Sequence, residues 1–153
     1  MNYLKYILAA GVSYLLQTTL CADWPFKPEL VLLLFCLFFS GHSVRAVWAG
    51  LGTGLALDLC NGYGFYNTIL YTLAGAVCGF LPPGVFQDRR SLALVGFILS
   101  TLLLQFGHPF LTLIFLRQAI CAPLPVYLGT LAADMICFFC LYWLFWREQV
   151  SNG

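Results

Sequence analysis

Long apolar segments separated by short polar turns are the feature that most limits how this chain can fold. A helix that crosses a bilayer needs roughly 20 predominantly apolar residues, with a range of about 17 to 25. Charged residues make up only 8% of the chain, whereas soluble globular domains carry about 25%. These charges are too few to cover a water-facing surface. The sequence therefore predicts an all-α integral membrane protein.

The apolar segments predict a single transmembrane domain over residues 1–153, with about six helices in one bundle. The first segment is long for a signal peptide and more spans follow it, so we expect it to be retained as a helix. The expected spans, in order, are residues 4–20, 28–42, 44–60, 64–81, 92–117 and 121–146.

Residues 29–59 allow either one long helix or two short ones. One helix would bury Arg45 near the bilayer centre, where insertion scales give a cost of about 2.5 to 3.5 kcal/mol. Two helices joined by the polar turn "SGHSVR" avoid this cost, so we expect two. Pro28 suits the first turn of the earlier helix, where a missing N–H group is not a loss.

The basic residues divide unevenly between the two sides of a six-span protein. Two of them, Lys27 and Arg117, fall on the side opposite the termini. Five share the side of both termini: Lys5, Arg45, Arg89, Arg90 and Arg147. Under the positive-inside rule, both termini are expected in the cytoplasm. No basic cluster in the sequence is large enough to suggest a nucleic-acid partner.

Small residues recur every four positions in "GLGTGLALDLCNG", at Gly50, Gly54 and Gly62, with Asp58 in the same series. Residues four apart lie close to one helix face, and small residues let membrane helices approach closely. We therefore expect this face to pack against another helix, with Asp58 facing protein rather than lipid.

A buried carboxylate must be paired, hydrogen-bonded or neutralised. The break "NGYG" leaves free backbone amides that could cap Asp58. The first interpretation of Asp58 is a polar clamp between helices. A site for a substrate, a proton or a lipid head group is the main alternative. A catalytic role, or an acid wetted at the interface, is a lesser one.

Asp134, in "GTLAADMICF", is the second acid inside an apolar span. It must pair or stay neutral, and Arg117 at the end of the fifth span is the candidate partner. A structural ion pair and a functional role both stay open for Asp134.

Motifs typical of enzymes are missing from the sequence. There is no nucleophilic-serine motif, no HExxH spacing and no phosphate-binding loop. Asp58 and Asp134 are expected at different depths, which argues against an intramembrane aspartyl protease. The seven cysteines are scattered, mostly in apolar segments, as small hydrophobic residues would be. We expect no catalytic residue, no metal and no cofactor.

The order of these elements resembles the MreD family of rod-shape-determining proteins, which are small proteins of the bacterial inner membrane. The resemblance lies in "KPELVLLLFCLFF", the basic turn "HSVR" and "GLGTGLALDLCNGYGFYNTILYTLAG", and it covers about residues 27–81. The matching positions are Pro28, Arg45, Gly50, Gly54, Asp58, Gly62 or Gly64, and Gly75.

The resemblance implies a scaffold or regulatory subunit of the cell-wall elongation complex, which maintains rod shape. Its direct partner would be an MreC-like single-pass membrane protein. Indirect partners would be an MreB-like filament, a RodA-like glycosyltransferase and a class B penicillin-binding protein.

The same family looks similar in fold to the six-helix substrate-binding subunits of energy-coupling-factor vitamin transporters. A substrate-capture subunit of that kind is therefore the alternative function. It would need a pocket with several convergent polar groups. The spans offer little beyond Asp58, Asn61, Asn67 and Asp134.

Overall fold

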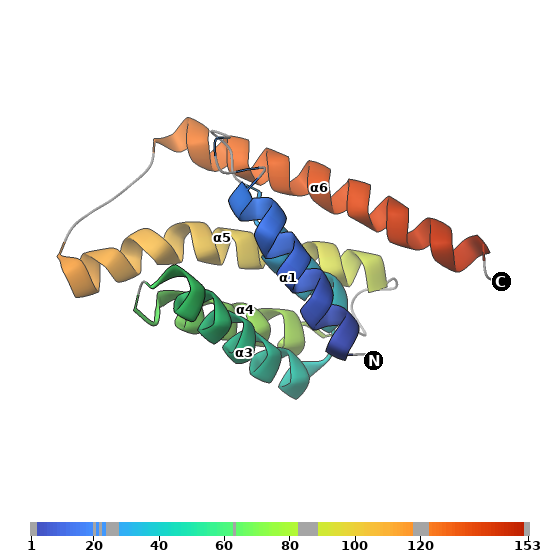
Figure 1. Ribbon diagram of the computed structural model, residues 1–153, viewed down its shortest axis with the longest axis horizontal. Helices are drawn as coiled ribbons and strands as arrows, with labels where there is room; N and C mark the ends of the chain where they lie inside the picture. Colours follow the sequence, from blue (N-terminus) through green and yellow to red (C-terminus); the bar gives the residue numbers. More distant parts are fainter. Residues whose placement is uncertain are drawn as a thin grey trace. The chain divides into compact units, whose positions relative to one another are not determined.

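The computed structural model is all α-helical, with six helices and no strand in the residues that it describes (Figure 1). The described residues are 3–19, 21, 23, 28–62, 64–82, 89–117 and 123–151. The prediction of an all-α protein is confirmed. The helices are α1 (Tyr3–Thr19), α2 (Leu30–Phe39), α3 (Ser43–Asn61), α4 (Tyr66–Phe80), α5 (Arg89–Leu116) and α6 (Leu124–Ser151).

Two of the helices are long and apolar enough to cross a membrane: α5 over Ser91–Leu116 and α6 over Leu124–Leu141. The apolar helix α2 has only 10 residues. At 1.5 Å per residue it is about 15 Å long, roughly half the hydrocarbon thickness of a bilayer. A bundle of six complete spans therefore stays a prediction.

The boundary between α2 and α3 is a tight turn. The chain leaves the helix at Ser40, and Gly41 adopts a φ of +81°, a conformation that favours glycine. Arg45 then lies in the first turn of α3 with its side chain exposed. The polar turn thus separates two helices and keeps the guanidinium out of the protein interior.

The start of α2 differs slightly from the expected one. The N–H of Leu33 donates to the carbonyl oxygen of Glu29 at 3.0 Å, so Glu29 is the residue that caps this helix. Pro28 lies one position before the cap, fully buried, rather than in the first turn. The helix therefore begins two residues after Pro28, because its first hydrogen bond is accepted by the carbonyl of Glu29.

The chain divides into two compact units. One consists of residues 1–33 and 122–153, and the other of residues 34–121. Helix α2 crosses the boundary between them. Lys27 and residues 83–88 lie outside the described residues, as do the side chains of Arg89, Arg90 and Arg147. The count of basic residues on each side therefore stays a prediction.

In the unit of residues 34–121, α3 packs on α4 and α4 packs on α5, each antiparallel to the next (Figure 1). The C-terminal part of α2 also contacts α4. The ring of Phe35 meets that of Tyr71 edge-on at 6.3 Å, and the N–H of Gly41 donates to the carbonyl of Cys78 at 3.2 Å. Four large side chains are fully buried in this core: Phe35, Phe39, Tyr71 and Phe97.

A short line of sulfur and hydroxyl groups crosses the same core. The Sγ atoms of Cys36 and Cys78 lie 3.4 Å apart, and Cys78 Sγ lies 3.3 Å from Ser100 Oγ. All three side chains are completely buried. These weak hydrogen bonds link α2, α4 and α5 while the side chains fill space as small hydrophobic residues do.

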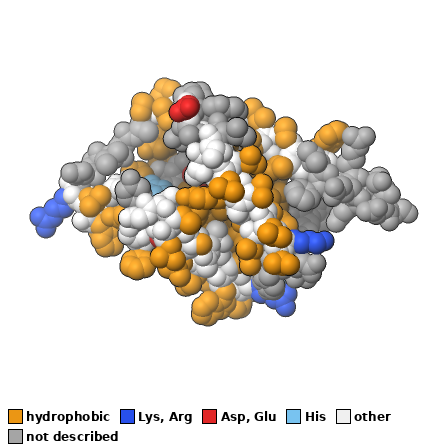
Figure 2. All heavy atoms as spheres, viewed as in Figure 1, with side chains coloured by type: hydrophobic (Ala, Val, Ile, Leu, Met, Phe, Trp, Pro, Cys, Tyr) orange, Lys and Arg blue, Asp and Glu red, His pale blue; other side chains and the backbone are white. Residues whose placement is uncertain are grey.

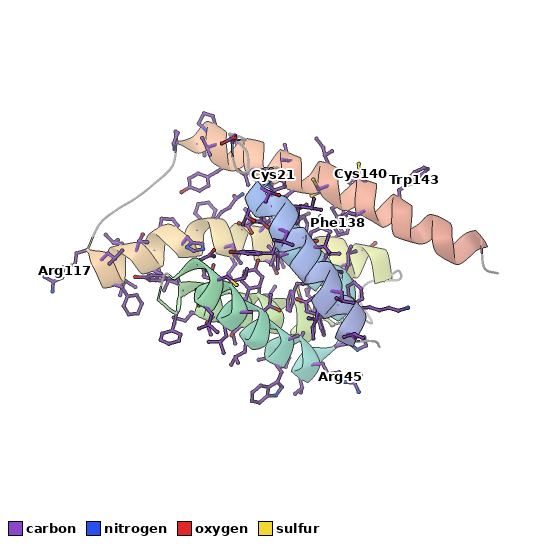
Figure 3. The ribbon with its side chains drawn as sticks, viewed as in Figure 1. Cys21, Arg45, Arg117, Phe138, Cys140 and Trp143 are labelled. Carbon is purple, nitrogen blue, oxygen red and sulfur yellow. The ribbon has the colours of Figure 1, made fainter. Side chains whose placement is uncertain are left out.

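Arg45 and Arg117 lie at opposite ends of this unit and both point away from it (Figure 3). Arg45 is near the start of α3, and Arg117 directly follows α5. The three antiparallel helices α3, α4 and α5 lie between them. The sides of a membrane on which the two arginines lie stay a prediction.

Much of the outward-facing surface of the helices is apolar in both units. Figure 2 shows many hydrophobic side chains on the described part of the visible face, with few charged groups among them. Soluble monomers rarely expose apolar patches larger than a few hundred Å². Large side chains of this kind include Leu4, Ile7 and Leu8 of α1, Phe106, Phe110 and Phe115 of α5, and Ile136, Phe139 and Trp143 of α6.

Candidate functional site

Three glycines bring α3 and α4 into backbone contact. A Cβ atom on Gly54 would lie 2.5 Å from the carbonyl oxygen of Asn67 and 2.6 Å from the Cα of Thr68. A Cβ on Gly50 would likewise overlap the carbonyl of Tyr71. These obstacles are backbone atoms, which cannot move aside as a flexible side chain can. Only glycine fits at these positions.

Helix α4 contributes the third glycine of this contact. A Cβ on Gly75 would overlap the carbonyl of Ala46. By contrast, Gly52 of α3 has nothing within 4 Å of its Cβ position. The requirement for glycine is therefore confined to one face of α3 and the part of α4 that meets it. This is the close helix approach that the four-residue spacing predicts.

Asp58 lies at the end of this contact and caps α4. Its Oδ1 accepts the N–H of Asn67 at 3.0 Å, and its Oδ2 accepts the N–H of Thr68 at 2.7 Å and the hydroxyl of Thr68 at 2.6 Å. Phe65, the N-cap residue of α4, makes no side-chain cap of its own. Asp58 thus satisfies, from a neighbouring helix, amides that α4 leaves without partners.

The buried side chain of Asp58 uses both of its oxygens in hydrogen bonds. The side chain is 6% exposed, yet both oxygens accept hydrogen bonds. The N-terminus of a helix also carries partial positive charge and favours a nearby anion by about 0.3 to 1 kcal/mol, up to about 2 when partly buried. Asp58 of α3 is therefore an N-cap for the neighbouring helix α4.

Gly62 has a different role from the other glycines of the series. It is the C-cap of α3 in the left-handed conformation, with φ +68°, and its N–H donates to the carbonyl of Asp58 at 2.9 Å. Nothing lies within 4 Å of its Cβ position. Gly62 therefore ends α3 and reverses the chain, which brings the start of α4 beside Asp58.

Asp134 occupies a comparable position in the other unit. It is completely buried in α6, and its Oδ1 accepts the N–H of Glu29 at 2.7 Å. Because Glu29 is the cap residue of α2, Asp134 also bonds the N-terminus of another helix. Its Oδ2 has no hydrogen-bond partner. Arg117 belongs to the unit of residues 34–121, and its pairing with Asp134 stays a prediction.

Glu29 and Gln17 join Asp134, and neither residue was expected there from the sequence. The Nε2 of Gln17 donates to Oε2 of Glu29 at 3.2 Å, while Oε1 of Gln17 is buried without a partner. Their positions in the sequence could have indicated this proximity. Gln17 lies near the end of one apolar segment, and Glu29 lies at the start of the next. Polar residues there are usually assigned to the membrane surface, which is why their convergence was missed.

In the described part of the chain, no group of three or more His, Cys, Asp or Glu side chains is arranged to hold a metal ion. The candidate sites are thus two aspartates, each at the N-terminus of a neighbouring helix. One has its hydrogen bonds complete and one does not.

Comparisons of the chain with protein-family models, with curated proteins and with solved structures find no match. The resemblance of residues 27–81 to the MreD family therefore stays a prediction.

Proposed function

We propose that this chain is a multi-pass protein of the bacterial inner membrane, with six spans and both termini in the cytoplasm. Two observations support a membrane setting: α5 and α6 include apolar stretches long enough to span, and large apolar side chains cover outward faces of helices. The shorter helices would cross a locally thinned bilayer or pack within the protein.

Within that membrane, the chain acts as a non-catalytic scaffold or regulatory subunit of the wall-elongation complex, bound to an MreC-like partner. One observation carries this proposal. Four positions of the family pattern, Gly50, Gly54, Asp58 and Gly75, meet at the contact between α3 and α4. Residues that resemble the family's pattern thus build one rigid helix pair.

The hydrogen bonding of Asp58 supports a structural role for this acid. Both of its oxygens are occupied by donors from the first turn of α4. A general base or a proton carrier needs an oxygen that can reach its substrate. The α3–α4 pair is therefore a platform that holds the outer helix faces in place for a partner.

Reporter fusions test the topology. Fusions after Trp24 and after Arg117 are expected to report an extracytoplasmic location, and a fusion after Arg89 a cytoplasmic one. The physical reason is the excess of basic residues on the side of the termini. An extracytoplasmic reading at Arg89 would defeat the six-span arrangement.

Crosslinked co-purification from native membranes tests the partner. The expected neighbours are an MreC-like single-pass protein and, through it, a class B penicillin-binding protein. Gly54→Leu should reduce the recovered partner at least tenfold relative to Gly52→Leu, since only the first change disturbs the α3–α4 pair. Recovery of an energy-coupling factor instead would favour the vitamin-transport alternative and contradict the scaffold.

A further inference from the structure

Asp134 and Asp58 are both buried acids at the N-terminus of a neighbouring helix, but their hydrogen bonding differs sharply. Asp58 accepts hydrogen bonds from three donors, with both oxygens occupied. Asp134 is completely buried and accepts one, on Oδ1, while its Oδ2 has none. An ionised carboxylate with a bare, buried oxygen is strongly unfavourable.

The groups around Asp134 supply a donor to its Oδ1 but none to its Oδ2. Glu29 places a second carboxyl group beside it, and Oε2 of Glu29 already takes the hydrogen bond from Gln17. The Oε1 of Gln17 is a further buried oxygen without a donor. Helix α1, the start of α2 and α6 are thus linked through these side chains. Two buried oxygens among them, Oδ2 of Asp134 and Oε1 of Gln17, have no hydrogen-bond donor.

No positive side chain offsets this shortage in the part of the chain that the structure describes. The ionisable side chain that acts on Asp134 is a second carboxyl group, that of Glu29. The other titratable groups nearby are Cys137 on the same helix, together with Cys140 and Cys21, which are close to Cys137. The N-terminus of α2 favours an anion, but a helix dipole contributes less than an unpaired buried charge costs.

We propose that Asp134 binds a proton in the folded protein at neutral pH. A proton on Oδ2 turns an acceptor that lacks a donor into a donor. It also removes the repulsion between Asp134 and Glu29. A metal ion would instead need several further oxygen ligands and a cavity to hold them.

This proton site is separate from the proposed scaffold role, which rests on the α3–α4 pair. It gives the unit of residues 1–33 and 122–153 a buried acid whose charge state depends on its neighbours. Ionisable groups inside membrane segments commonly mark such functional positions.

Infrared spectroscopy of the full chain in lipid at neutral pH tests the proposal. The carbonyl stretch of a protonated carboxylic acid should be present, should shift in heavy water, and should disappear in Asp134→Asn. The matched control is Asp58→Asn, which should keep the band because both oxygens of Asp58 already accept hydrogen bonds. Absence of the band from the unsubstituted protein would overturn the proposal, as would its loss in Glu29→Gln but not in Asp134→Asn.

Two further measurements keep the test decisive. The first applies if Asp134→Asn does not fold, and the second asks whether Lys27, which lies outside the described residues, pairs with Asp134. Carbon-13 labelling of aspartate carboxyl groups in the unsubstituted protein should shift the band, while labelled glutamate should not. Lys27→Gln should leave the band unchanged. If the band appears only after Lys27 is replaced, an ion pair holds Asp134 and the proton site is wrong.

Discussion

Gly54→Leu is expected to destabilise the folded protein by about 3 kcal/mol or more, because it forces a side chain into a contact between two backbones. A Cβ atom alone would lie 2.5 Å from a backbone oxygen of α4 and 2.6 Å from a Cα. Since neither atom can rotate away, α3 and α4 must separate, and the contact made by Gly50 and Gly75 is lost with them. Unfolding in mixed micelles, followed by helical signal, measures the loss.

The matched control for this change is Gly52→Leu, two residues away on the same helix. Its Cβ position has nothing within 4 Å, so the substitution should change stability by less than about 0.5 kcal/mol. Equal destabilisation by the two variants would mean that α3 does not pack on α4 through the glycine face.

Asp58→Leu is expected to cost about 2 to 6 kcal/mol, because it leaves the partly buried amides of Asn67 and Thr68 without acceptors at about 1 to 3 kcal/mol each. The hydroxyl of Thr68 can rotate to another acceptor and adds less. Asp58→Asn keeps one oxygen and the shape of the side chain, so it should lose roughly half as much. The same micelle unfolding assay compares the two.

Thr68→Val separates the side-chain hydrogen bond from the backbone ones. It removes the hydroxyl donor to Asp58 but keeps both amides, and we expect a loss of about 1 kcal/mol. Under the scaffold proposal, cells that carry Asp58→Leu should lose their elongated shape. Less of the MreC-like partner should co-purify with this variant. If Asp58→Asn abolished function while the protein stayed abundant and partner-bound, the carboxylate would be performing chemistry, and the scaffold proposal would fail.

The local arrangement around α3 was accessible from sequence because it depends on spacing. Four-residue intervals place Gly50, Gly54 and Asp58 on one face whatever the rest of the chain does. The break after Asn61 leaves the next helix with free amides close by in sequence. A carboxylate that precedes such a break by a few residues has donors within reach.

The surroundings of Asp134 were not accessible in the same way. Its hydrogen-bond partner, Glu29, lies 105 residues earlier in the chain. No spacing rule connects positions so far apart, and the expected partner Arg117 was chosen only for its expected side of the membrane. The helix lengths were also harder to derive, since hydropathy alone extended α2 by a few residues at each end.

The two caps have different consequences for the order in which the protein assembles. Asp58 precedes the amides it caps by 9 and 10 residues, so the start of α4 is satisfied as soon as that short stretch leaves the ribosome. The start of α2 must wait for Asp134, on the last helix to be synthesised. During that interval the early amide of Glu29 has no permanent acceptor in the chain. A chain that ends before α6 would therefore contain the whole α3–α4 pair with its cap, while the N–H of Glu29 would lack its acceptor.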